Sequence, residues 1–208
     1  MNSAFENISE IKRNMIIKTC LKEFSIYGYE NASTNRIVNS ANISKGILFH
    51  YFKSKSNLFY YMLNYSQDII KNNTINELKK ITNTDFCDRL KEFIKISVKI
   101  GLTYKDEYII YKSFICSSTL DYNNEIKKLH IRGLQFDNMI YNLYLFQFLN
   151  KDIIKTSLEE KILKDYILNL INFLTGKYIE LNKNETKDIL NFNDLDNYIN
   201  LLKFGFIE

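Results

Sequence analysis

Proline is absent from this chain of 208 residues, and only six residues are glycine. Proline and glycine are the residues that most often interrupt helices and form hairpin turns, so both kinds of signal are scarce here. Apolar residues also recur at helical spacing from end to end, as in Ile16, Cys20 and Phe24. The sequence therefore predicts an all-α fold of about nine helices, without strands or internal repeats.

Three short helical segments are expected within the first 54 residues. The first ends at Gly28, which can adopt a left-handed conformation. The second begins at Ser33 or Thr34, because either hydroxyl can cap a helix N-terminus. Asn42 tolerates the positive φ of a tight turn, and Ser44 can cap a third helix over about residues 44–52. Beyond them, helices are expected at about 55–78, 85–102, 105–117, 122–149, 157–181 and 194–206.

Several classes of protein are disfavoured by the composition. The three cysteines (Cys20, Cys87 and Cys116) are far apart, and with two histidines they form no metal-ligand pattern and no disulfide framework. No apolar run is long enough for a membrane span, and the N-terminus has no signal-peptide pattern. No nucleophile motif or glycine-rich phosphate loop is present. We therefore expect a cytoplasmic protein that is not an enzyme and that has no metal or cofactor.

The positive charge of the chain is concentrated near its N-terminus. Residues 1–57 contain eight basic and four acidic residues, whereas the remaining 151 residues contain 20 of each. An excess of basic residues is what binding to phosphates requires. The excess is small, and alone it would carry little weight.

The third short helix has two chemically different faces. Leu48 and Phe52 lie four residues apart, so they are expected to face the core together with Ile43. This leaves four side chains outside: Lys45, Phe49, His50 and Tyr51. Exposed rings and an imidazole suit the major groove, where they can meet thymine methyls, base edges and phosphates. The alternative is three simply packed helices, with Phe49 and Tyr51 as core residues.

The segment of about residues 10–65 resembles the N-terminal domain of TetR-family (TetR/AcrR-like) transcriptional repressors. The resemblance rests on Phe24 with Gly28-Tyr29, Thr34 with Ile37, Ser44-Lys45-Gly46, Leu48, Tyr51-Phe52-Lys53, Lys55 and Leu58-Phe59. Two positions depart from the family pattern: Phe49 stands where the family generally has Tyr, and Asn42 replaces a common glycine. The resemblance implies a helix-turn-helix DNA-binding domain over 1–54 and a helical ligand-binding and dimerisation domain over 55–208.

The resemblance and the outward face together give a set of expected DNA contacts. They are Thr34, Asn35, Arg36, Ser44, Lys45, Gly46, Phe49, His50, Tyr51 and Lys55. The expected function is that of a homodimeric repressor, released from a palindromic double-stranded DNA operator by a small molecule. The alternative is a TetR-like DNA-binding protein without such an effector, which is constitutive or controlled by a protein partner.

Two further sites are expected in the remainder of the chain. The resemblance places the dimer interface on helices of about 157–182 and 194–206, and the expected contacts are Tyr166, Leu170, Leu174, Tyr178, Ile199 and Leu202. Burial of the first of these helices within its own subunit is the alternative. The resemblance also implies an effector pocket, here for an apolar or planar ligand, and the expected lining is Phe93, Tyr108, Tyr111, Phe114, Tyr141 and Tyr144. Ordinary core packing would also explain these rings.

Overall fold

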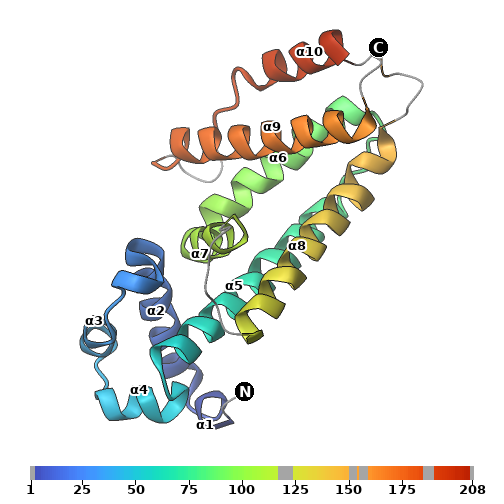
Figure 1. Ribbon diagram of the computed structural model, residues 1–208. Helices are drawn as coiled ribbons and strands as arrows, with labels where there is room; N and C mark the ends of the chain where they lie inside the picture. Colours follow the sequence, from blue (N-terminus) through green and yellow to red (C-terminus); the bar gives the residue numbers. More distant parts are fainter. Residues whose placement is uncertain (1–2, 117–123, 150–153, 155–158, 185–189, 207–208) are drawn as a thin grey trace. The chain divides into compact units, whose positions relative to one another are not determined.

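The computed structural model describes residues 3–116, 124–149, 154, 159–184 and 190–206 (Figure 1). Over these residues the chain is all-α, as predicted, and contains no strand. The elements are α1 (Ser3–Glu6), α2 (Glu10–Asn31), α3 (Thr34–Ser40), α4 (Lys45–Phe52), α5 (Lys55–Leu78), α6 (Phe86–Thr103), α7 (Lys105–Ile115), α8 (Asn124–Tyr144), the short 3-10 helix η1 (Phe146–Phe148), α9 (Glu160–Leu181) and α10 (Leu195–Phe206).

Most of the predicted helices are present with small shifts at their ends. The short α1 was not expected, and it raises the number of described α-helices to ten. The helix expected over 122–149 ends at Tyr144 and is followed by η1. The expected starts at residues 122 and 157 lie outside the described residues. None of the described helices is both long and apolar enough to cross a membrane.

The chain forms two compact units, and α5 and α8 each contribute to both. The first unit comprises residues 1–70 and 106–133, and the second comprises 71–105 and 134–208. The core of the first unit contains buried residues of α2, α4 and α5, among them Phe24, Leu48 and Met62. This division concerns compactness alone, so a functional boundary at residue 54 stays a prediction.

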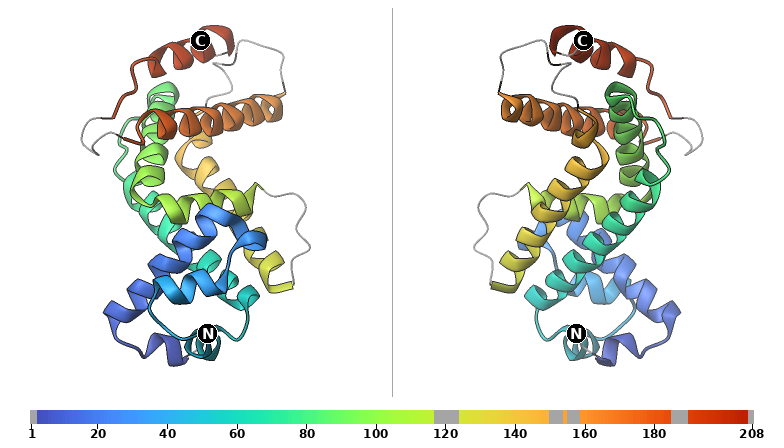
Figure 2. Two further views of the ribbon diagram at one scale, coloured as in Figure 1. Left: turned by 90° about the vertical axis from the view of Figure 1, so that its left-hand side faces the viewer. Right: turned by 90° about the vertical axis from the view of Figure 1, so that its right-hand side faces the viewer.

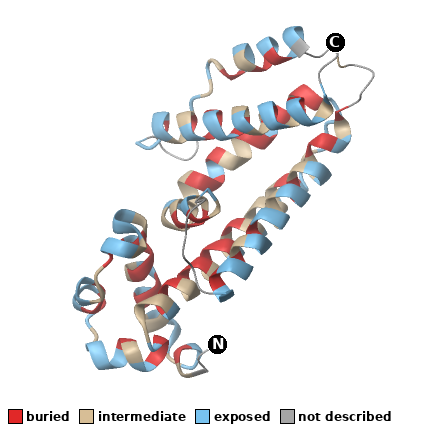
Figure 3. Cartoon of the chain, in the orientation of Figure 1, coloured by how far each residue is buried: buried red, intermediate tan, exposed pale blue. Residues whose placement is uncertain are grey.

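In the second unit, α6 packs against both α9 and α10 (Figure 2). Ile94 and Val98 of α6 are fully buried, as are Ile167 and Leu174 of α9. Exposed residues alternate with buried ones along α9 (Figure 3), so the helix has one face in the core and one face in solvent. The unit therefore holds α9 by one side and leaves its other side uncovered within the described chain.

Both predicted turn positions in the first unit have a positive φ, but only Asn42 has the predicted role, since Gly28 does not end its helix. Gly28 has φ 66° and ψ −178°, a conformation that is essentially restricted to glycine, although helical structure resumes after it and α2 ends at Asn31. Asn42 has φ 48°, as predicted for the turn between α3 and α4. Both positions therefore supply a positive φ where the chain changes direction.

Replacing Gly28 with Ala should destabilise the first unit by about 1–3 kcal/mol, because a side chain makes this φ and ψ costly. An added Cβ meets no atom within 4 Å, so the cost would come from the backbone and not from a clash. Gly46→Ala is the matched control: Gly46 is helical, its nearest neighbour would be Ser44 Oγ at 3.8 Å, and alanine should be neutral or stabilising there. Urea unfolding followed by circular dichroism measures both; equal stabilities would contradict the assignment of strain to Gly28.

Candidate nucleic-acid interface

Two short helices and a tight turn make up the candidate interface. The amide of Ala41 donates to the carbonyl of Ile37 at 2.9 Å, and that of Ile43 donates to Val38 at 3.0 Å. Both helices are capped as predicted: the Ser33 hydroxyl accepts from the Arg36 amide at 3.4 Å, and the Ser44 hydroxyl accepts from the Ile47 amide at 3.2 Å. Caps matter here because helices of seven and eight residues have little stability of their own.

Three side chains fix the orientation of α4. Leu48, Tyr51 and Phe52 are all buried, with Tyr51 only 9% exposed. Phe5 of α1 packs on two of them, with ring centroids 5.4 Å from Tyr51 and 4.7 Å from Phe52. The expectation that Tyr51 lies on the outer face is therefore wrong: positions 48, 51 and 52 share one helix face, and Phe5 covers it.

Four of the ten predicted DNA contacts lie on the part of α4 that is not buried in the core. Lys45, Gly46 and His50 are exposed, and Phe49 is half-buried. Ile47 is also exposed, at 36%, and the sequence-based set does not include it. From α3, Asn35 is exposed and Thr34 is half-buried in the first turn. The structure thus brings these residues together on one helix-turn-helix element.

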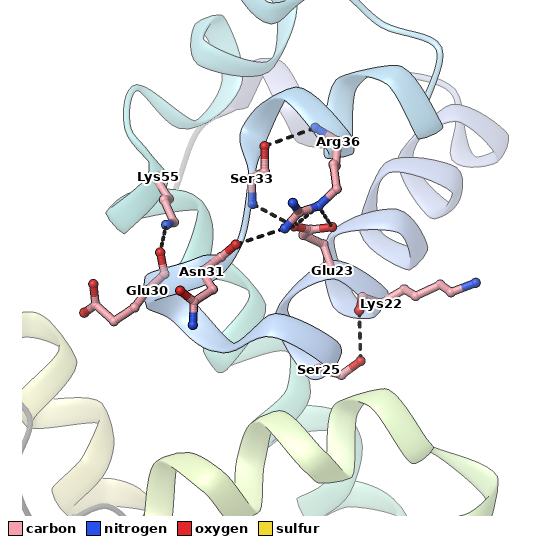
Figure 4. A network of polar contacts seen from close by, with 8 residues as sticks. All are labelled: Lys22, Glu23, Ser25, Glu30, Asn31, Ser33, Arg36 and Lys55. Atoms are coloured by element: carbon pink, nitrogen blue, oxygen red, sulfur yellow. Dashed lines mark hydrogen bonds and ion pairs between the residues drawn. The ribbon is translucent and has the colours of Figure 1, made fainter.

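Arg36, another predicted DNA contact, is engaged in an ion pair inside the protein (Figure 4). Its Nε donates to both carboxylate oxygens of Glu23 at 2.9 and 3.1 Å, and its Nη2 donates to the Asn31 carbonyl at 2.9 Å. The ring of Tyr27 lies 4.1 Å from the guanidinium carbon. The backbone amide of Ser33 donates to the same carboxylate at 2.7 Å. Arg36 and Glu23 thereby tie the start of α3 to α2.

The protonation of Glu23 depends on these partners. Burial of the carboxyl acts to raise its pKa. The hydrogen bonds from Arg36 and Ser33, together with the positive charges of Arg36 and Lys55, outweigh this effect and hold the pKa of Glu23 below its ordinary value. The carboxylate is therefore charged at neutral pH, and it stabilises the fold only while it stays charged.

Lys55 also has a partner within the protein. Its Nζ donates to the carbonyl of Glu30 at 2.9 Å (Figure 4) and lies 5.0 Å from the centre of the Tyr29 ring. An ammonium has three donor hydrogens, so this contact leaves donor capacity for a phosphate. Lys55 thus joins the end of α2 to the start of α5 beside the helix-turn-helix.

The residues of the predicted effector pocket are divided between the two units. Tyr108, Tyr111 and Phe114 belong to the first unit, while Phe93, Tyr141 and Tyr144 belong to the second. Phe93, Tyr111 and Phe114 are 2–3% exposed and pack in the cores. Tyr144 lines a cleft of about 380 Å³ in the second unit, beside Arg89 and Phe148. Much of the aromatic content is thus core packing, which was the alternative interpretation.

Four of the six predicted dimer contacts are buried within their own unit. Leu174, Tyr178, Ile199 and Leu202 are at most 1% exposed and lie in the core of the second unit, whereas Leu170 is half-buried and Tyr166 is exposed. The exposed apolar residues of α9 and α10 are instead Ile162, Tyr166, Phe173, Leu181, Leu201 and Phe204. Both faces of α9 carry apolar residues, so the spacing of these residues in the sequence did not show which face packs against α6.

The α3–turn–α4 geometry is that of a helix-turn-helix, the class of fold in which a second helix enters the major groove. Residues 16–62 match the sequence model of the family described as bacterial regulatory proteins, tetR family. The chain is 32% identical over 143 residues to YuxN of Bacillus subtilis (strain 168), an uncharacterized HTH-type transcriptional regulator. That match covers 64% of this chain and 46% of YuxN, less than half of its length.

Solved structures share the fold over nearly the whole chain. A TetR family transcriptional regulator from Chloroflexus aurantiacus J-10-fl superposes with a TM-score of 0.73 at 16% identity, covering 99% of this chain and 98% of that one. FadR of Bacillus subtilis, solved in complex with stearoyl-CoA, gives a TM-score of 0.60 at 14% identity, with 91% and 96% coverage. Residues 16–62 thus carry the sequence pattern of the tetR family, and the chain shares its fold with solved TetR-family structures.

Replacing Arg36 with Ala should lower the thermal unfolding midpoint at neutral pH, because it leaves the buried carboxylate of Glu23 without its main partner. The folded pKa of Glu23 is lowered, so its contribution is complete above the unfolded value of about 4.3 and is lost as the pH falls through the folded value. The difference in unfolding midpoint between the wild type and Arg36→Ala should therefore become smaller at acidic pH. Asn35→Ala, an exposed change on the same helix, is the control. Equal unfolding midpoints for the two variants at neutral pH would show that the Glu23–Arg36 ion pair does not stabilise the fold.

Proposed function

We propose that this protein is a sequence-specific DNA-binding transcriptional regulator that acts in the cytoplasm as a homodimeric repressor. The observation that carries the proposal is the division of α4 into two faces. Leu48 and Phe52 are buried, while Gly46 and His50 are exposed on the other side and Lys45 is exposed in the first turn. A helix held in this way can enter the major groove without losing its own packing.

The exposed groups suit two kinds of contact with DNA. Lys45 at the start of α4 and Lys55 at the start of α5 supply positive charge for phosphates. Gly46 lets the helix approach the DNA backbone closely, since it has no side chain. Phe49 and His50 are placed to meet thymine methyls and base edges. Phosphate contacts would set the register, and the two rings would contribute sequence discrimination.

Two features support dimerisation: the small surface that one helix-turn-helix offers to DNA, and the apolar surface of the second unit. One helix-turn-helix contacts few base pairs, so such proteins bind paired half-sites about 34 Å apart. Phe173 of α9 is 58% exposed, and Leu201 and Phe204 of α10 are 71% and 73% exposed. Exposed apolar side chains gathered on neighbouring elements favour burial against a second protein surface. We assign this surface to a second copy of the chain.

Control by a small effector is the leading proposal for regulation, since FadR of Bacillus subtilis, which shares the fold, was solved with stearoyl-CoA. One observation favours the second candidate, a regulator that is constitutive or controlled by a protein partner. Phe93, Tyr111 and Phe114, which were expected to line the pocket, are buried in cores. Titrating a protein–operator complex with candidate ligands distinguishes the two, since release of DNA supports the first alone.

Lys45→Ala should weaken binding to all DNA sequences and reduce the slope of log affinity against log salt by about 1. His50→Ala should instead narrow the difference in affinity between operator and unrelated DNA, because it removes a contact to base edges. Fluorescence anisotropy over a range of salt concentrations measures both effects. Lys127→Gln, an exposed change on α8, provides the control. Unchanged affinity and salt slope for Lys45→Ala would oppose the proposed orientation on DNA.

A charge placed in the exposed apolar surface should prevent dimerisation. Phe173→Glu combined with Leu201→Glu should convert the dimer into monomers, because each carboxylate would lose its water at the interface. Ile26→Glu, an equally drastic change at a 59% exposed residue of α2, should leave the dimer intact. Light scattering coupled to size-exclusion chromatography gives the masses. A wild-type monomer, or a double variant that stays dimeric, would refute the assignment.

A further inference from the structure

A cavity of about 640 Å³ lies within the first unit, beside the C-terminal end of α4. Its walls come from α1, α4, α5 and α8, all of them through residues of that unit. Sites for small molecules typically have volumes of roughly 300–1,000 Å³, so the size is adequate for a ligand of two fused rings. None of its lining residues belongs to the aromatic set expected to form the effector pocket.

The floor of the cavity is aromatic and largely buried. Phe5, Tyr51 and Phe52 line it and are each at most 9% exposed, while Tyr60 and Tyr61 add half-buried rings. Phe5 meets Tyr61 edge to face, with centroids 5.4 Å apart and planes at 90°. Rings favour such edge and offset contacts with further rings. A flat aromatic ligand therefore suits this floor better than a flexible aliphatic chain.

The rim of the cavity is cationic. Lys53, at the C-cap of α4, and Arg132 of α8 both line it and are exposed. No ion pair of either side chain occurs within the described part of the chain, and no acidic residue lines the cavity. The carboxylate of nearby Glu6 accepts a hydrogen bond from Tyr61 at 2.9 Å and pairs with Arg13 at 3.7 Å. The rim thus presents positive charge that the lining does not balance.

Two polar neighbours complete the rim. Asn57 is exposed and lines the cavity, and Asn64 lines it about two turns further along α5. The amide of Asn64 donates to Asp68 at 3.2 Å, which directs that donor toward a residue outside the lining. Asn57 has its side-chain amide available at the mouth. This arrangement supplies neutral hydrogen-bonding groups beside the two cations.

We propose that this cavity is a second ligand site, which binds a planar aromatic carboxylate. The ring of the ligand packs against Tyr60 and Tyr61, the two half-buried rings of the lining, and its carboxylate meets Arg132 and Lys53 at the rim. A guanidinium can hold a carboxylate through two parallel hydrogen bonds, and the ammonium adds a point charge. The site lies inside the unit that carries the helix-turn-helix, and its ligand contacts the last turn of α4.

Calorimetric titration of the full chain in the absence of DNA tests the proposal, so its result does not depend on whether the protein binds an operator. The probe is 2-naphthoate, with 2-naphthalenemethanol as a neutral molecule of the same ring system. Naphthoate should bind with one site per chain, and the alcohol should bind about tenfold more weakly or worse, because it cannot pair with the cations. Inorganic phosphate should not compete at equal concentration, since it lacks the ring.

Two sets of variants locate the site. Lys53→Gln combined with Arg132→Gln should weaken naphthoate about tenfold or more, while Lys127→Gln on α8 should not. Asn57→Trp should abolish binding by filling the mouth from an exposed position, whereas Asn72→Trp, an exposed site of α5 outside the cavity, should not. The chain has no natural tryptophan, so each of these two variants carries a single indole whose fluorescence reports its surroundings. Circular dichroism checks that both variants fold like the wild type.

Three results would overturn the proposal. One is the absence of naphthoate binding at concentrations up to about 1 mM, which corresponds to a very weak complex. Another is equal affinity for the acid and the alcohol, which would remove the role of the cationic rim. The third is naphthoate binding that survives both Asn57→Trp and the double glutamine variant, since the ligand would then lie elsewhere.

Discussion

The second helix of the helix-turn-helix depends on how three side chains anchor its eight residues. A helix of two turns is unstable by itself in water, so α4 persists because Leu48, Tyr51 and Phe52 are buried. Their burial also decides its rotation: once positions 48, 51 and 52 face inward, Gly46 and His50 must face outward, whereas Lys45 is exposed because it is the first residue of the helix. The same buried side chains thus stabilise α4 and determine which of its faces is exposed.

The helix before it is held by polar contacts as well as by packing. α3 has seven residues and buries Ile37 and Val38, and its start is fixed by the Ser33 cap and the Glu23–Arg36 pair. An arginine on the surface of a helix-turn-helix would be expected to bind phosphate, but its Nε and Nη2 donate to a buried carboxylate and a carbonyl. The positive charge of Arg36 therefore serves to hold α3 against α2.

Local features were predictable from the sequence, and long-range ones were not. Caps at Ser33 and Ser44 and the positive φ at Asn42 depend on a few neighbouring residues, and the structure confirms all three. The placement of Tyr51 depends on Phe5, which comes far earlier in the chain and lies in a helix that the sequence did not predict. Likewise, α9 is apolar on two faces, and only the packing of α6 decides that Leu174 is core while Phe173 is exposed. Such placements are decided by contacts between distant segments, about which periodicity carries no information.

The two ends of α4 have different surroundings, and this difference bears on how the DNA face could be modulated. At its start, Ser44 caps the helix and Leu48 packs in the core, and neither residue lines the cavity. At its end, Tyr51, Phe52 and Lys53 form part of the cavity wall. A ligand changes a protein's affinity for DNA only to the extent that it favours one arrangement of the residues it touches. An occupant of the proposed site would touch the turn of His50, the proposed base contact, and would leave the turn of Lys45 alone. In the proposed mode of DNA binding, any coupling should therefore act on discrimination between sequences more than on attraction to phosphates.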